Sequence, residues 1–159
     1  MSWFAAKEHC EGEGGKLVEI DSEEENTALV DEINRRGFTD RNMNFWIGLN
    51  DLVKEGDWRL ASSGLKPFYL NWHHDQPNNR GGNEHCARIR IGPDARWKDT
   101  WSVTNCNIPA LTGLWTQRLW TMHALCEFNP STESPSTEGT TTEDTKAEST
   151  ATEGVTTKS

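Results

Sequence analysis

The stretch "FWIGLND", residues 45–51, is the most apolar short run in the first half of this chain. An apolar run of this length between polar segments is typical of a buried strand. Four further segments later in the chain, divided by turn residues, predict short strands: "DWRLASSG" at 57–64, "FYLNW" at 68–72, "HCARIRI" at 85–91 and "HALCEF" at 123–128. The second half of the folded region is therefore expected to be mainly β structure.

Two helices are expected before this run. Residues 2–14 carry an apolar stripe at helical spacing and stop at a Gly-Gly pair; the stripe is Trp3, Phe4, Ala6 and Cys10. The segment "KLVEI" at 16–20 predicts a short strand. A second helix opens at Ser22, which forms a capping-box pattern with Glu25, and ends at Gly37. Helices followed by short strands predict an α+β fold.

The last part of the chain differs sharply in composition. All eight tryptophans and all four cysteines lie within residues 1–128, whereas residues 129–159 are rich in Ser and Thr, acidic and free of aromatic residues. Such a segment cannot bury enough apolar surface to offset its ordering entropy. We expect one folded domain at 1–128 and a disordered tail at 129–159, either an O-glycosylated stalk or a plain solvated linker.

Charge and cysteine usage restrict the class of protein. A formal net charge of -9 argues against a nucleic-acid partner, and no apolar run approaches the roughly 20 residues that span a bilayer. Four cysteines without a Cys-x-x-Cys pair favour two disulfides, with four reduced, buried thiols as the alternative. Disulfides require an oxidising compartment, so we expect a secreted or extracellular protein whose signal peptide is not visible in this chain.

The ordered motifs resemble the C-type lectin-like domain family over nearly all of residues 2–128. "SWFAAKEHC" resembles its first helix, "FWIGL" its core strand and "HALCEF" its closing strand. The resemblance implies disulfides Cys10–Cys126 and Cys86–Cys106. It also implies a missing N-terminal strand, which would leave an unpaired sheet edge. The segment between Cys106 and Cys126 is longer and more apolar than is usual in the family; it could cover the core, form a partner surface or reflect a gene-model error.

The stretch "DQPNNRGGNEHC", residues 75–86, carries the candidate binding site. Calcium prefers carboxylate and amide oxygens, which Gln76, Asn78 and Glu84 supply, and a cis bond at the proline between the two amides would turn both to one side. A turn-forming proline in a solvated loop is the alternative. The resemblance implies a primary calcium site formed by these residues with Asp99, at which the ion and its ligands bind sugar hydroxyls together. Trp101 is a candidate for stacking on the sugar, or a core residue.

Two departures from the family pattern bear on this site. The triplet Gln-Pro-Asn lies between the Glu-Pro-Asn and Gln-Pro-Asp patterns that the family associates with mannose-like and galactose-like sugars, so the sugar stays unnamed. Lys98 replaces a family asparagine and cannot ligate calcium while charged; it either points outward or opposes the ion. We expect weak calcium affinity, about 0.1 to 1 mM.

A secondary calcium site is partly present. The resemblance assigns it Asp51 and Glu55, with Asn79 and Glu84 completing it from the long loop, and His85 stands where an acidic residue would help. Surface carboxylates in a turn are the alternative interpretation.

The sequence thus predicts a calcium-dependent carbohydrate-binding module with glycans or glycoproteins as partners. A single shallow site binds weakly, so several copies would act together. The competing hypothesis is a calcium-independent domain that binds a protein or another non-sugar partner. We do not expect an enzyme, because no nucleophile elbow, phosphate loop or His-Glu-x-x-His motif occurs.

Overall fold

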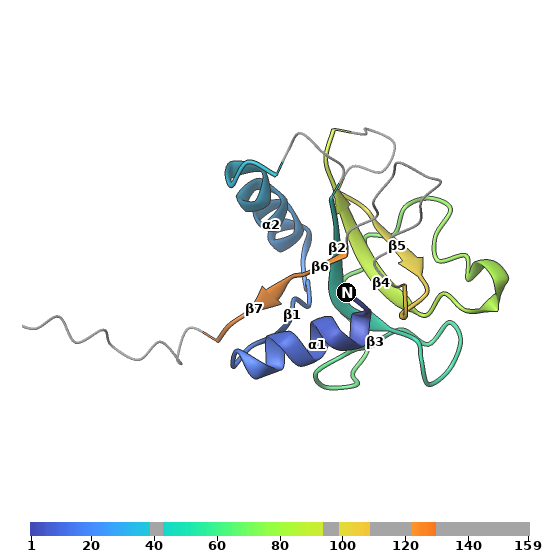
Figure 1. The fold of residues 1–159 in the computed structure, drawn as a ribbon. Coiled ribbons are helices and arrows are strands. Elements are labelled where there is room, and N and C mark those ends of the chain that lie inside the picture. The colour runs from blue at the N-terminus through green and yellow to red at the C-terminus, as the bar shows by residue number, and fades with distance from the viewer. Residues whose placement is uncertain (39–42, 94–98, 109–121, 130–159) are drawn as a thin grey trace, which may run out of the picture.

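The computed structural model describes residues 1–38, 43–93, 99–108 and 122–129 (Figure 1). Two α-helices, α1 (Trp3–Gly12) and α2 (Glu23–Arg35), flank short strands. The strands in these ranges are β1 (Lys16–Leu17), β2 (Met43–Asn50), β3 (Arg59–Leu60), β4 (Cys86–Ile91), β5 (Trp101–Thr104), β6 (Met122–Ala124) and β7 (Cys126–Glu127), with one 3₁₀ turn, η1 (Arg80–Gly82). The predicted α+β class is confirmed.

Both helices begin at serines that cap them. Ser2 Oγ accepts a hydrogen bond from the Ala5 amide at 3.1 Å, and Ser22 Oγ accepts one from the Glu25 amide at 3.1 Å. Each bond satisfies an amide that has no partner within its own helix. The Glu25 carboxylate closes the motif one residue earlier than a standard capping box, because it accepts from the Asp21 amide at 2.8 Å.

Strand β2, which contains the "FWIGL" segment, is the centre of the larger sheet. Its neighbours are β3 and β4, both antiparallel, and β6, which is parallel, while β5 pairs with the far side of β4. Strands β1 and β7 form a separate two-stranded sheet (Figure 1). Within the described ranges, β7 pairs with no strand other than β1. The proposed absence of a family N-terminal strand stays a prediction.

Alternate side chains of β2 face two hydrophobic clusters, as the period of a strand requires. Phe45, Ile47 and Leu49 pack in the cluster that includes residues of α2, β4 and β5. Trp46 packs in the second cluster with three residues of α1: Trp3, Ala6 and Cys10. A strand buried on both faces explains why its sequence is continuously apolar rather than alternating.

The two disulfides are those that the resemblance implied. Cys10–Cys126 joins α1 to β7 across 116 positions, and Cys86–Cys106 joins the start of β4 to the segment after β5 across 20. The first ties the ends of the domain together. The second anchors the C-terminal end of the loop that carries Gln76, Asn78 and Glu84 to the segment after β5.

The strand expected at "FYLNW" does not form. Among the described residues, its one ladder contact is an isolated bridge between Trp72 and Trp101, and Phe68 and Leu70 are exposed. Two bonds make this bridge: the Trp101 amide donates to the Asn71 carbonyl at 2.8 Å, and the His73 amide donates to the Trp101 carbonyl at 2.9 Å. The strand that does form here is β5, because Trp101–Thr104 has a continuous partner in β4. Apolar composition alone could not distinguish these two segments.

Several predicted features lie outside the described residues: the tail at 130–159, Lys98, and the apolar residues at 111–120 between Cys106 and Cys126. Among the helices that the structure describes, none is both long and apolar enough to cross a bilayer.

Candidate functional site

The candidate ligands lie around the long loop between β3 and β4, drawn in green to yellow-green on the right of Figure 1. The Gln76–Pro77 bond is cis, as predicted. Backbone bonds tie this part of the loop to β5: the His73 amide donates to the Trp101 carbonyl at 2.9 Å, and the Gln76 amide donates to the His73 carbonyl at 2.8 Å. The Gln-Pro-Asn triplet is therefore held against the sheet.

Two of the predicted primary ligands converge on one backbone amide. The Arg80 amide donates to Glu84 Oε2 at 2.9 Å and lies 3.3 Å from Asn78 Oδ1. Gln76 Oε1 faces the sheet and accepts from the Val103 amide of β5 at 2.9 Å. The loop thus brings the oxygens of Asn78 and Glu84 together, while the amide oxygen of Gln76 already has a protein donor.

Asp99, the fourth predicted ligand, is fixed through its backbone. It has a left-handed φ of 63°, and its carbonyl accepts from Asn71 Nδ2 at 2.8 Å and from Asn26 Nδ2 at 3.3 Å. The Asp99 amide donates to the Arg90 carbonyl at 3.1 Å. Contacts from α2, β4 and the long loop therefore fix the backbone position of Asp99.

Sequence reasoning missed Asn26 and Asn71 as positioning residues. Asn26 is buried on α2 and lies on the same helical face as Val30 and Ile33. A polar residue within an apolar stripe was the available signal, because a buried amide requires partners. Asn71 gave no comparable signal, since it lies in a segment whose pattern predicted a strand.

The expectation that Trp101 stacks on a sugar is wrong. Its side chain is 1% exposed, and its indole Nε1 donates to Asn26 Oδ1 at 2.9 Å. Its ring packs edge to face with Tyr69 and Trp72, at centroid distances of 5.5 and 6.0 Å. A ring enclosed in this way has no face available for a ligand, so the core alternative applies. Trp72 packs against the same cluster.

The residues assigned to the secondary site are partly brought together. Asp51, Glu55 and His85 each place a ligand atom within 4.8 Å of the others. Asn79 Nδ2 donates to Glu55 Oε2 at 2.5 Å, and Asn79 Oδ1 accepts from the Glu84 amide at 2.9 Å. The Glu84 carboxylate turns toward Arg80 instead. His85 therefore contacts both carboxylates of this group, and Glu84 joins it through its backbone.

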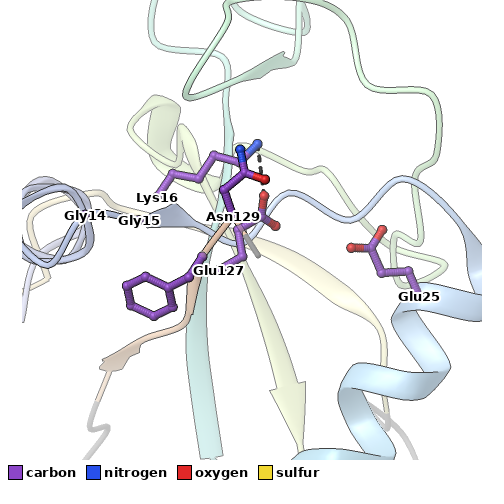
Figure 2. Close-up of a pocket in the computed structure, with 7 residues that line it drawn as sticks. Gly14, Gly15, Lys16, Glu25, Glu127 and Asn129 are labelled. Carbon is purple, nitrogen blue, oxygen red and sulfur yellow. Dashed lines mark ion pairs between the residues drawn. The ribbon is translucent and has the colours of Figure 1, made fainter. Parts of the chain in front are cut away.

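A separate hollow of about 570 Å³ lies at the β1–β7 sheet (Figure 2). It is lined by Gly14, Gly15, Lys16, Glu25, Glu127, Phe128 and Asn129. The charged groups of Lys16 and Glu127 form an ion pair at 3.0 Å, and the Glu25 carboxylate caps α2. These charges already have protein partners, and no predicted ligand lies here, so we assign this hollow no role.

A family model for the lectin C-type domain matches residues 1–112 of this chain. The protein therefore belongs to the C-type lectin domain family, whose members are binding domains rather than enzymes. The expectation that it is not an enzyme agrees with this membership.

Two relatives illustrate the similarity. A perlucin-like protein of Mytilus galloprovincialis is 37% identical over 62% of this chain and 61% of its own length. The hepatic lectin of Gallus gallus is 34% identical over 67% of this chain and 47% of its own length. The match thus spans about half to three fifths of these two proteins.

Solved structures show the same fold. The human scavenger receptor C-type lectin carbohydrate-recognition domain is 27% identical, with a TM-score of 0.57 over 68% of this chain and 77% of that one. The cow C-type carbohydrate-recognition domain of CD23, determined in the presence of a GlcNAc2Man3 oligosaccharide, is 30% identical, with a TM-score of 0.53 over 67% and 71%. The chain therefore has the fold of these C-type lectin domains.

Proposed function

We propose that this domain binds glycans through a calcium ion held by Gln76, Asn78, Glu84 and Asp99. The supporting observation is the convergence of the Asn78 and Glu84 oxygens on the Arg80 amide, beside a cis Gln76–Pro77 bond. Both oxygens lie within 3.3 Å of the Arg80 amide nitrogen. The binding module occupies residues 1–128 of a secreted protein, with 129–159 as a tail.

The chemistry of the donor set fits calcium. Glu84 and Asp99 supply two carboxylates and Asn78 supplies an amide oxygen, all of the hard-oxygen type that calcium prefers. Gln76 Oε1 accepts from the Val103 amide, but a carbonyl oxygen has two lone pairs, so the second can still face an ion. Two charged ligands are few for this ion, so the expected affinity stays at about 0.1 to 1 mM.

A bound ion would attract the oxygens of adjacent sugar hydroxyls. The protein's part is to hold complementary groups around them: carboxylates accept hydrogen bonds from hydroxyls, and amide groups can donate to them. With amides on both sides of Pro77, the donor and acceptor pattern is nearly symmetric, so it does not select between mannose-like and galactose-like hydroxyls. Glycan affinity at one such site should be weak, and several copies should bind together.

Retention on mannose and galactose resins tests this proposal. The metal-stripped protein should pass through, and calcium alone should restore retention; refilling with zinc alone should not. Glu84→Gln should abolish retention, whereas Glu8→Gln, the same chemical change on the exposed side of α1, should not. Retention by the stripped protein, or by Glu84→Gln in calcium, would contradict calcium-dependent binding.

Lys98 favours a second candidate, a domain that binds a protein or another non-sugar partner without calcium, because an ammonium replaces a family amide. Glycan-array binding that is equal with calcium and with EDTA, or a partner captured equally in both, would support this candidate over the first.

A further inference from the structure

A second group of metal-ligating side chains lies where β2 ends and β4 begins. His85 Nδ1 is 3.0 Å from Asp51 Oδ1 and 3.4 Å from Glu55 Oε2, and the three ligand atoms lie within 4.8 Å of one another. One imidazole nitrogen thus faces two carboxylate oxygens. This group differs from the proposed calcium site, whose four donors are all oxygen atoms.

The backbone fixes the two innermost members of this group. Asn50 and Cys86 are partners in the β2–β4 ladder, so the residues next to them, Asp51 and His85, emerge side by side. The Asp51 amide donates to the His85 carbonyl at 3.1 Å, and the Cys86–Cys106 disulfide anchors the same strand end. Binding a metal would therefore cost little backbone ordering at these two residues.

The turn after β2 orients the Asp51 carboxylate. Asp51 is 2% exposed, and its Oδ2 accepts from the Gly56 amide at 2.8 Å, which leaves Oδ1 directed at His85. The outer members are accessible, since the side chains of His85 and Glu55 are 28% and 58% exposed. A buried ligand with more exposed partners gives an ion a route from solvent.

The donors and their spacing fit zinc better than calcium. Calcium in proteins takes about six to eight oxygen ligands, whereas zinc takes four from nitrogen, oxygen and sulfur. With zinc–ligand bonds of about 2.0 to 2.2 Å, the edge between two ligands of a tetrahedron is about 3.3 to 3.6 Å. The nitrogen–oxygen distance of 3.4 Å lies within this range, and the distance of 3.0 Å lies below it. We propose that Asp51, Glu55 and His85 bind a zinc ion in place of the calcium expected at a secondary site.

The groups around the three proposed zinc ligands are also compatible with a zinc site. Asn79 Nδ2 donates to Glu55 Oε2, which orients that ligand from outside the site in the way that outer-shell partners do. Three protein ligands leave a fourth position for water or for a donor from a bound partner. All four cysteines are in disulfides, so no thiolate of this chain competes for the metal.

Another group, His73, His74 and Asp75, also places ligand atoms within 4.8 Å. Its outer members, His74 and Asp75, are mostly solvated, with side chains 77% and 67% exposed. We use this group as the internal control.

Calorimetric titration of the metal-stripped protein with zinc tests the proposal. We expect one zinc per chain, and His85→Ala should weaken binding by more than about 100-fold, since loss of an outer-shell partner alone costs roughly 10- to 100-fold. Glu55→Gln should also weaken zinc binding. Because Glu55 is exposed, this variant should fold even if His85→Ala does not, so it tests the site independently. His74→Ala should bind like the parent, and His85→Asp should lose zinc affinity and gain calcium affinity.

Unchanged zinc binding by His85→Ala, or its loss in His74→Ala, would overturn the assignment. Absence of zinc heat in the parent protein would overturn it as well. The result is independent of the proposed function: Glu84→Gln should lose calcium-dependent glycan retention and keep its zinc affinity. Cobalt provides a second measurement, because four-coordinate cobalt absorbs visible light strongly and six-coordinate cobalt weakly. A weak spectrum would contradict the tetrahedral site.

Discussion

Replacing Trp101 with phenylalanine separates a structural role from a ligand-binding one. Trp101 is enclosed by Tyr69 and Trp72 and donates through Nε1 to Asn26 Oδ1 at 2.9 Å. Phenylalanine keeps one ring and removes both the donor and part of the packed volume. The change therefore affects the contact between α2 and β5 without touching an exposed surface.

The magnitude follows from these two losses. A buried acceptor left without its donor costs about 1 to 3 kcal/mol. Truncating a buried tryptophan to alanine costs about 3 to 5 kcal/mol, and phenylalanine retains most of that packing. We expect Trp101→Phe to lower the free energy of unfolding by about 2 to 4 kcal/mol. In urea, with a slope near 2 kcal/mol per molar, the midpoint should fall by about 1 to 2 M.

Urea denaturation gives the stability, and a double-mutant cycle with Asn26→Ala isolates the hydrogen bond. The coupling energy should be about 1 to 2 kcal/mol. In calcium, the glycan affinity of the folded variant should stay within about threefold of that of the parent. A stable variant that has lost glycan binding would refute the structural account and restore Trp101 as a sugar contact. A loss of stability below about 0.5 kcal/mol would refute the packing argument.

Three other changes give distinct results. Gly48→Ala should destabilise the domain by more than about 2 kcal/mol in urea denaturation, because a Cβ there would lie 2.9 Å from a backbone carbonyl of β1; a neutral effect would contradict that close approach. Asn71→Ala removes one hydrogen-bond donor to the Asp99 carbonyl and should weaken calcium binding several-fold in calorimetry. Calcium affinity equal to that of the parent would contradict a positioning role for Asn71. Burial, with repulsion from the N-terminal amine, lowers the pKa of His123 below its usual 6.5. The free energy of unfolding should therefore be highest above pH 6.5 and should fall as the pH decreases toward the lower pKa of the folded state. His123→Asn should flatten this pH dependence in denaturation curves measured at several pH values, and an unchanged slope would contradict the assignment.

The helices and the central strand could be predicted because local signals and tertiary packing agree there. Ser2 and Ser22 cap their helices, and β2 is buried on both faces, which its continuous apolar pattern indicates. The prediction of a strand at "FYLNW" was wrong because, among the described residues, this segment has a bridge at Trp72 alone and no continuous ladder. Whether an apolar run becomes a strand depends on neighbours that only the fold supplies.

The candidate site, like the fold, could be predicted from the sequence only in part. Residue types and the family resemblance indicated which oxygens could bind a cation, and a cis bond was one of the two alternatives for Pro77. Sequence could not show that Trp101 is enclosed, or that Asn26 reaches Asp99 from α2 across 73 positions. It also could not show that His85 faces Asp51 directly. These contacts depend on how separate elements pack.

The most direct measurement of the central claim is a calcium titration by calorimetry, with and without saturating mannose or galactose. If the ion and its ligands bind the sugar together, the sugar must tighten calcium by the same factor by which calcium tightens the sugar. We predict that at least one of the two sugars tightens calcium several-fold in the parent, and that neither does so in Glu84→Gln. Calcium affinity that neither sugar changes in the parent would contradict the claim.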